Sequence, residues 1–289
     1  MPAGSRPHDV APAPDGGVWY TAQGSGELGR LDPATGEIVH IVLGSGSRPH
    51  GVIVDDQGTP WVTDGGLNAV VSVDPSTHEP TVYPLPDDRV DSSVHTATFD
   101  DQGILWFTGQ AGVFGSLDPT TGEVAVYDAP GGNGPYGITA TPDGSVFYAS
   151  LAGSHIAAVG DDGSVTILEP PTPDQGARRV WSDSEGSIWV SEWNSGNLAR
   201  YVPADEEWTT WPLPGDNPAA YAVYVDEADI VWLSDFGANA MVRFDPVSEE
   251  FAGYALPHDP GEVRQILGRP GEVWGAESAA NQLILIRTK

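Results

Sequence analysis

Side chains able to exchange protons recur at one fixed place along this sequence, eleven residues before an aromatic anchor. Imidazole changes its charge near neutral pH, and histidine is therefore a frequent general acid or base. When the repeats are aligned on their anchors, these positions form one column, and the column has no aliphatic member. That is unusual for a core position, so we expect these side chains to face an open channel. For any single histidine, the alternative is a structural hydrogen bond to a neighbouring repeat. The column consists of His8, His50, His95, Tyr136, Arg178, Tyr221 and, after a loop contraction of one residue, Arg264.

A second column lies three residues after each anchor and is rich in carboxylates. If both columns approach one axis at the same end, three neighbouring imidazoles and several acids line a common funnel. The competing interpretation is that the acids cap turns or pair with Arg178 and Arg264. The second column consists of Ala22, Asp64, Gly109, Ser150, Glu192, Asp235 and Glu277. Outer strands or connecting turns, where we expect solvent exposure, hold the remaining histidines: His40, His78, His155 and His258.

The anchors reveal the elements that must position these columns. They lie 41 to 45 residues apart, which is the spacing of a four-stranded sheet that recurs around a central axis. The sequence therefore predicts an all-β fold, a seven-bladed β-propeller with four-stranded blades, in which residues 1–289 form a single domain. The anchors are Trp19, Trp61, Trp106, Phe147, Trp189, Trp232 and Trp274.

The last repeat is shorter than the others. Asp-Pro-x-Thr-Gly turns, as at residues 32–36, link the third strand to the fourth in complete repeats. After Trp274 only one more strand pattern follows, so we predict a three-stranded final blade whose outermost strand spans residues 283–287. Because residues 5–8 already begin the first blade, we expect the natural chain to carry an extra strand before residue 1.

The composition argues against several classes of partner. The formal net charge is −29 at pH 7 and Lys289 is the only lysine, whereas nucleic-acid or anionic-membrane binding needs clustered cations. No apolar run is long enough to span a bilayer. The chain has no cysteine, which excludes disulfides and fits a cytoplasmic protein without excluding a secreted one. We expect a cytoplasmic monomer that binds a small molecule or a cyclic peptide in the central funnel.

Three phrases of the repeat carry a resemblance to a known family. They are Arg-Pro-His-Gly-Val at residues 48–52, Tyr-Pro-Leu-Pro at residues 83–86 and Trp-Phe-Thr at residues 106–108. With them the whole chain resembles the streptogramin B lyases, the virginiamycin B lyase family of seven-bladed propellers. The resemblance implies an enzyme that linearises cyclic depsipeptide antibiotics with the help of magnesium. A base removes the proton α to a carbonyl, and the ester oxygen leaves as a carboxylate.

The catalytic pattern of that family is a His on one blade, then Glu-x-His and a downstream Glu on the next. At the corresponding final blades this chain has Tyr221 in place of the first His and Arg264 in place of the second, although Glu277 lies within one residue of the downstream Glu. Histidines on consecutive blades occur instead at His8 and His50, where Arg48 stands in place of the family's Glu.

The resemblance therefore implies a lyase whose site is rotated around the ring. We expect His50 to act as the general base, with His8 and His95 as acid or orienting groups. Magnesium, which prefers hard oxygen ligands, would bind near Asp64 and Glu277. The remaining members of the first column would bind substrate, and these are Tyr136, Arg178, Tyr221 and Arg264.

Two other functions remain open. A non-catalytic propeller similar to the NHL-type binding modules would hold a small molecule or peptide in the same funnel. A metal-dependent lactonase like the gluconolactonase-type propellers is less favoured, because the carboxylates lack an obvious Asn and Glu partner set. Bound metal in the funnel would discriminate between an enzyme and a binding module.

Overall fold

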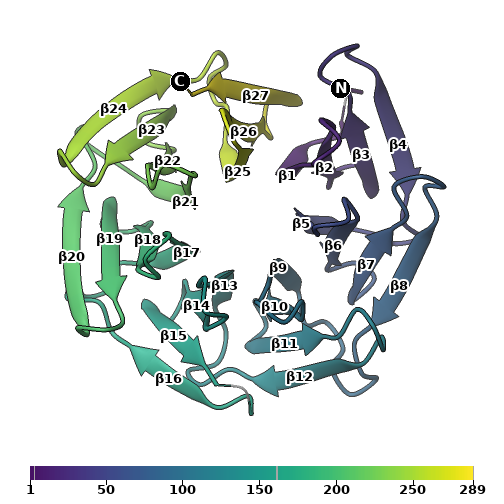
Figure 1. The fold of residues 1–289 in the computed structure, drawn as a ribbon, viewed down its shortest axis with the longest axis horizontal. Coiled ribbons are helices and arrows are strands. Elements are labelled where there is room, and N and C mark those ends of the chain that lie inside the picture. Colours follow the sequence, from purple (N-terminus) through teal and green to yellow (C-terminus); the bar gives the residue numbers. More distant parts are fainter. Residues whose placement is uncertain (3, 161, 289) are drawn as a thin grey trace.

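Seven antiparallel sheets stand around a central axis, as Figure 1 shows. The computed structural model describes residues 1–2, 4–160 and 162–288. Six sheets have four strands and one has three, so the predicted seven-bladed propeller and its three-stranded last blade are confirmed. In the described ranges, no helix is long and apolar enough to cross a membrane.

Within each blade the strands follow one another in chain order from the axis outward. The first blade contains β1 (Pro7–Pro12), β2 (Val18–Ala22), β3 (Glu27–Leu31) and β4 (Ile38–Val42). The second contains β5 (Pro49–Val54), β6 (Pro60–Asp64), β7 (Ala69–Val73) and β8 (Pro80–Pro84). The third contains β9 (Val94–Phe99), β10 (Leu105–Gly109), β11 (Val113–Leu117) and β12 (Val124–Asp128). The fourth contains β13 (Pro135–Ala140), β14 (Val146–Ser150), β15 (His155–Val159) and β16 (Val165–Leu168).

The remaining three blades continue the same order around the ring. The fifth contains β17 (Ala177–Ser182), β18 (Ile188–Glu192), β19 (Asn197–Val202) and β20 (Glu207–Pro212). The sixth contains β21 (Ala220–Val225), β22 (Val231–Asp235), β23 (Ala240–Asp245) and β24 (Glu250–Ala255). The seventh contains β25 (Val263–Arg269), β26 (Glu272–Glu277) and β27 (Gln282–Arg287), so the predicted outermost strand is present.

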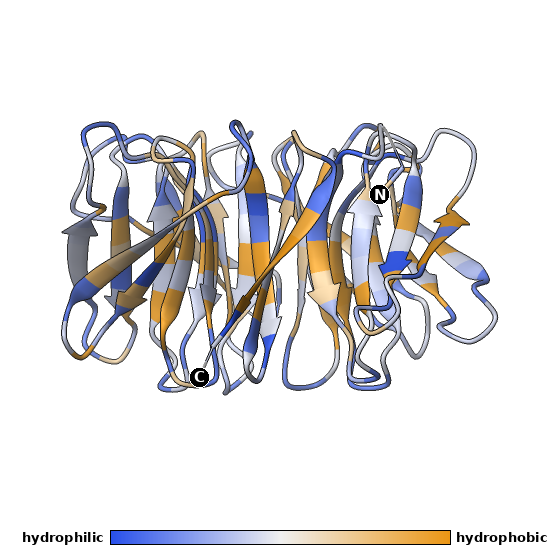
Figure 2. Cartoon of the chain, turned by 90° about the horizontal axis from the view of Figure 1, so that it is seen from above, coloured by the Kyte–Doolittle hydropathy of each residue, from blue (hydrophilic) through white to orange (hydrophobic). Residues whose placement is uncertain are grey.

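The anchor tryptophans pack between blades and use the acids of the turn before them. Trp61 Nε1 donates a hydrogen bond of 2.9 Å to Asp55, which lies six residues earlier and also accepts the amide of Thr59. The same indole-to-carboxylate bond joins three further pairs, Trp106 to Asp100, Trp189 to Asp183 and Trp232 to Asp226. Part of the large acidic content is therefore consumed in building the blades. Along several strands in Figure 2, hydrophilic and hydrophobic residues alternate.

All four outer histidines are less exposed than predicted, and two of them, His78 and His258, are half-buried in connecting segments. His155 is only 5% exposed, because it lies at the start of β15, between two hydrogen-bonded neighbour strands, with its Nδ1 3.1 Å from the carbonyl oxygen of Gly153. His40 is half-buried and contacts Tyr20 and Glu27. Third and fourth strands thus cover more of their side chains than the sequence pattern indicates.

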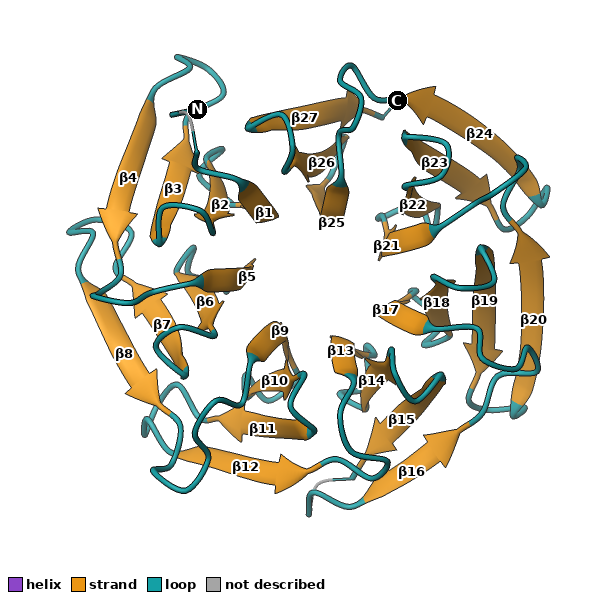
Figure 3. Cartoon of the chain, turned by 180° about the vertical axis from the view of Figure 1, so that it is seen from behind, coloured by secondary structure: helices purple, strands orange, loops and turns teal. Residues whose placement is uncertain are grey.

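The ring closes between the seventh and the first blade, where β25 and β1 lie side by side (Figures 1 and 3). The amide of Val10 donates to Gln265 Oε1 at 3.0 Å, and Ser278 Oγ donates to the carbonyl of Pro7 at 2.6 Å. These contacts involve the inner strands of the two blades, next to the axis. Side-chain hydrogen bonds therefore join the two blades that carry the ends of the chain.

Candidate functional site

Every inner strand has an irregularity where its column residue stands. In β5 the register with β6 shifts between Pro49 and Gly51, which places His50 in a bulge, and an equivalent shift occurs in all seven inner strands. A β-bulge bends its strand and redirects the side chain. The column residues therefore turn toward the axis at the end of the channel where the inner strands begin.

Hydroxyl groups of the repeated phrase fix the backbone of this column. Thr63 Oγ1 accepts a hydrogen bond of 2.9 Å from the amide of Gly51 and donates one of 2.5 Å to the carbonyl of His95 in the next blade. One hydroxyl thus ties the bulge of its own blade to the column residue of its neighbour. The same bond to the next carbonyl is made by Thr21, Thr108 and Ser191.

The three column histidines lie against one another at one end of the channel. His50 is in the middle, with ring centroids 3.9 Å from His8 and 3.6 Å from His95, and Tyr136 continues the row 3.9 Å beyond His95. Burial lowers the pKa of all three histidines well below the ordinary value. The charge of Arg179 adds to each pKa shift, and neighbouring imidazoles add to those of His50 and His95. The rings are therefore neutral at pH 7.

Hydrogen bonds select the tautomer of His50. Its Nδ1 lies 3.1 Å from the backbone carbonyl oxygen of His95, and because a carbonyl only accepts, Nδ1 carries the proton. Neutral His50 therefore has its lone pair on Nε2. His8 and His95 are 5% and 2% exposed, whereas His50 is half-buried. His50 combines a fixed tautomer with the greatest access to solvent of the three.

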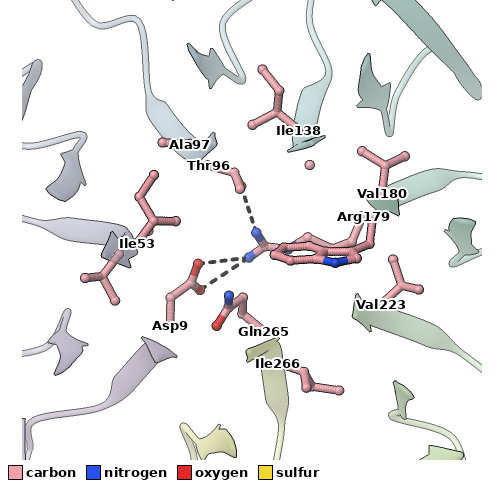
Figure 4. A pocket seen from close by; sticks show the side chains of 14 residues that line it. Asp9, Ile53, Thr96, Ala97, Ile138, Arg179, Val180, Val223, Gln265 and Ile266 are labelled. Atoms are coloured by element: carbon pink, nitrogen blue, oxygen red, sulfur yellow. Dashed lines mark hydrogen bonds and ion pairs between the residues drawn. The ribbon is translucent and has the colours of Figure 1, made fainter. Parts of the chain in front are cut away.

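An ion pair between Asp9 of β1 and Arg179 of β17 crosses the channel (Figure 4). Arg179 Nη2 lies 3.3 Å from Asp9 Oδ1, and its Nη1 donates to Thr96 Oγ1 at 2.7 Å. Asp9 also lies 2.6 Å from Nδ1 of His8. Burial raises the pKa of Asp9, and the charge of Arg179 opposes that shift. The remaining void among these side chains is about 20 Å³, so the funnel ends here instead of opening into a through channel.

The other half of the column forms a closed stack. Tyr136 and Tyr221 share a hydrogen bond of 2.5 Å between their hydroxyl oxygens, and Arg178 Nη2 donates to Tyr136 at 2.9 Å. The Arg178 guanidinium carbon lies 3.6 Å from the ring centroid of Tyr221, and that of Arg264 lies 5.7 Å away. Burial by itself would raise the pKa of Tyr221, but the charges of Arg178, Arg179 and Arg264 together with the hydrogen bond to Tyr136 lower it.

A cavity of about 370 Å³ opens beside His50, on the histidine side of the ring. Three consecutive blades supply its walls, through the starts of β5 and β9 and the turns after β2, β6 and β10. Its lining has imidazole, guanidinium, amide and hydroxyl groups but no carboxylate. The lining residues are Gln23, Arg48, His50, Gly65, Ser93, Val94, His95 and Gln110.

The carboxylates predicted to hold magnesium are fully buried and already hydrogen-bonded. Asp64 pairs with Pro49 across β5 and β6, which places it at the histidine end, but it accepts bonds from Ser47 Oγ and from the amide of Arg48. The amides of Gly66 and Leu67 also donate to it. Glu277 accepts the amide and the imidazole Nδ1 of His258, the latter at 2.8 Å. The two acids therefore hold the loops around the funnel.

Comparison with known proteins identifies the family to which this geometry belongs. Residues 42–289 match the model of the virginiamycin B lyase family. The chain belongs to this family. A virginiamycin B lyase from Nocardia farcinica (strain IFM 10152) is 32% identical over 116 residues, and that match spans only 39% of each of the two proteins.

Two solved structures from this group are similar in fold. Virginiamycin B lyase from Staphylococcus aureus superposes with a TM-score of 0.91 at 19% identity, covering 99% of this chain and 96% of the other. A streptogramin B lyase structure also gives 0.91 at 23% identity, covering 100% and 95%. At these identities the likeness concerns the propeller, and the site has to be argued from this chain's own residues.

The donor set of this virginiamycin B lyase family member does not fit a magnesium ion held by Asp64 or Glu277, because both carboxylates would first have to give up their loop hydrogen bonds. One other group, His8, Asp9 and His50, offers ligand atoms within 4.8 Å of one another. Arg179 already pairs with Asp9 there, so a cation would have to compete with a buried guanidinium. The magnesium assignment stays a prediction.

Sequence reasoning missed Asp9 and Arg179, which form the floor of the funnel. Both follow a column residue by one position, and the pair Arg178-Arg179 was visible as the only two adjacent arginines. Strand alternation would have placed the second arginine away from the axis. The bulge removes that alternation, and its presence leaves no clear mark in the sequence.

Proposed function

We propose that this protein is a carbon–oxygen lyase that opens an ester of a cyclic depsipeptide of the streptogramin B type, with His50 as the general base. The observation that carries the proposal is the fixed tautomer of His50, whose Nε2 lone pair is available at a 370 Å³ cavity. A volume of this size suits a small molecule or one face of a cyclic peptide. Membership of the virginiamycin B lyase family supports the type of reaction.

The reaction requires one proton transfer and one bond cleavage. His50 Nε2 takes the proton α to a substrate carbonyl, the electrons of that C–H bond form a carbon–carbon double bond, and the neighbouring carbon–oxygen bond breaks. The ester oxygen leaves with its electron pair as a carboxylate. Because the lowered pKa keeps His50 neutral at pH 7, the basic form is the resting form.

The neighbouring histidines position and polarise this base. Asp9 orients His8, and His95 Nδ1 lies 2.8 Å from Thr96 Oγ1, which Arg179 also contacts. Arg179 thus joins the two flanking histidines through Asp9 and Thr96. Contact with both flanks restrains the ring of His50, which favours a productive orientation toward the substrate. The substrate itself would extend over the opposite half of the column, along Tyr136, Arg178, Tyr221 and Arg264.

A non-catalytic binding propeller is the second candidate, and one observation favours it. This chain has Tyr221 and Arg264 at the two positions that correspond to the family's catalytic histidines. Arg264 Nη2 is paired with Glu262 at 2.6 Å. A propeller with tyrosine and arginine in place of these histidines would bind a ligand without catalysing its cleavage.

Liquid chromatography followed by mass spectrometry of a streptogramin B incubation separates the candidates, because a linear isomer elutes apart from the intact cyclic substrate. Elimination yields a linear product with the mass of the substrate, whereas hydrolysis adds the mass of one water. A lyase is expected to give the isomeric product, and His50→Ala to abolish its formation. An intact substrate together with saturable ligand binding would instead establish the binding module.

A further inference from the structure

Arg48 is the one cationic side chain in the wall of the cavity beside His50. The residue is exposed, and no side-chain partner for it is found among the described residues. Its amide is bonded to Asp64 Oδ1 at 2.8 Å, so the backbone from which the guanidinium extends is held in place. An unpaired guanidinium on a fixed backbone can bind a planar anion through two parallel hydrogen bonds.

The rest of the cavity is suited to the same kind of ligand. Gln23 and Gln110 provide amide donors, Ser93 provides a hydroxyl, and Nε2 of His95 is buried without a partner among the described residues. A buried nitrogen without a partner carries a desolvation cost that a ligand oxygen can relieve. In a chain with 41 acidic residues, a cavity lined by none of them avoids repulsion of an anion.

The charges around the column also favour an anion. Five of the eleven arginines gather at this end of the channel: Arg6, Arg48, Arg178, Arg179 and Arg264. Four of them act on His8, where after burial they contribute to the lowered pKa. Asp64 and Glu277 lie at the same end, but both are enclosed by donors of their own loops.

We propose that the cavity bounded by Arg48, His95 and Gln110 is a carboxylate-binding site, and that Arg48 receives the carboxylate that leaves when the ester is cleaved. The inference rests on the proposed elimination for its place in the reaction, while the binding site itself does not. Arg48 and His50 line the same cavity, so the base and the acceptor of the leaving group can act on one substrate. A guanidinium neutralises the charge that develops on the departing oxygen as the carbon–oxygen bond breaks.

Binding of benzoate and of its neutral analogue benzamide tests the site without turnover. Isothermal titration calorimetry of the whole chain is expected to show tighter binding of benzoate. Arg48→Gln should weaken benzoate about tenfold, as expected for the loss of a charge-assisted bidentate contact, and leave benzamide unchanged. Arg48→Lys should retain part of the affinity, because it keeps the charge and loses the fork.

Arg6→Gln is the matched control, because Arg6 precedes Pro7-His8 as Arg48 precedes Pro49-His50 but does not line the cavity. Equal affinity for benzoate and benzamide, or an unchanged benzoate affinity in Arg48→Gln, would overturn the site. Tighter binding of phenyl phosphate than of benzoate would overturn the carboxylate assignment. Arg48-dependent benzoate binding without any turnover of streptogramin B would refute the elimination and leave the site standing.

Discussion

Blades 1 to 3 and blades 4 to 7 present their column residues from equivalent bulges, yet the side chains meet the axis differently. On one side His8, His50 and His95 form a row beside a cavity of about 370 Å³. On the other, Tyr136 and Tyr221 are joined by a hydrogen bond and covered by Arg178. The repeat determines where each column residue stands around the ring, and the residue types determine which of these positions border the open cavity.

The largest effect is expected where one ion pair joins the two halves. Arg179→Met leaves the Asp9 carboxylate buried without its cation, which should lower the free energy of unfolding by about 3–5 kcal/mol. Urea unfolding followed by tryptophan fluorescence measures this. Adding Asp9→Asn to that variant should recover part of the loss, because the uncompensated charge is removed. A loss below about 1 kcal/mol in the single variant would show that the pair does not link the halves.

The next largest effect is expected on catalysis, and it should differ between the histidine side and the tyrosine side of the ring. His50→Ala should lower kcat at least about a hundredfold through loss of the general base. Tyr136→Phe, on the other half, removes one hydroxyl and is expected to change KM by no more than about tenfold. Product formation by mass spectrometry measures both, with His78→Asn in an outer turn as the control. Comparable losses in the two column variants would contradict the division of roles.

Protonation of the histidine row provides a pH test. Because the folded-state pKa values of His8, His50 and His95 are lowered, the unfolded chain binds more protons as pH falls below about 6.5. The free energy of unfolding should then decrease with falling pH, by up to about 1.4 kcal/mol per pH unit for each histidine. Urea midpoints from pH 7.5 to pH 5 measure the slope.

His95→Gln should flatten that dependence, whereas the remote His78→Asn should not. Protonation of carboxylates also lowers the free energy of unfolding at lower pH. The comparison between the two variants is therefore more informative than the wild-type slope. An unchanged slope in His95→Gln would mean that the row does not control the acid sensitivity.

A smaller shift is expected on the tyrosine side. Burial raises the pKa of Tyr221, but nearby arginine charges, that of Arg178 first, and the hydrogen bond with Tyr136 lower it on balance. Ultraviolet titration should therefore reveal one tyrosine that ionises below the ordinary value of about 10. Tyr221→Phe should remove this phase, and Arg178→Gln should move it to higher pH. If the titration phase stays at the same pH in Arg178→Gln, Arg178 does not lower the pKa of Tyr221.

The smallest effect concerns metal removal. Asp64 and Glu277 are occupied by loop hydrogen bonds, and Arg48 supplies a cation beside the base. Treatment with EDTA should therefore leave both turnover and benzoate binding within about twofold of the untreated protein. Loss of turnover that added magnesium restores would favour the metal site predicted from the sequence and weaken the role of Arg48.

Much of the fold was determined by the sequence alone. The spacing of anchors from Trp19 to Trp274 specifies the number of blades, because each repeat must bury its apolar strands against the next. The same rotation guarantees that His8, His50 and His95 occupy equivalent places, so their meeting at one end of the axis could be predicted. The short last repeat likewise indicated three strands in the final blade.

Only the tertiary structure decided which groups are free to act. Whether Asp64 faced the axis or its own loop depended on four donors that surround it in the folded state. Asp9 and Arg179 are 170 residues apart, and no local pattern indicates that their side chains would span the channel. The meeting of Asp9 with Arg179 depends on the bulges of β1 and β17, which cancel the regular alternation of side chains at these positions.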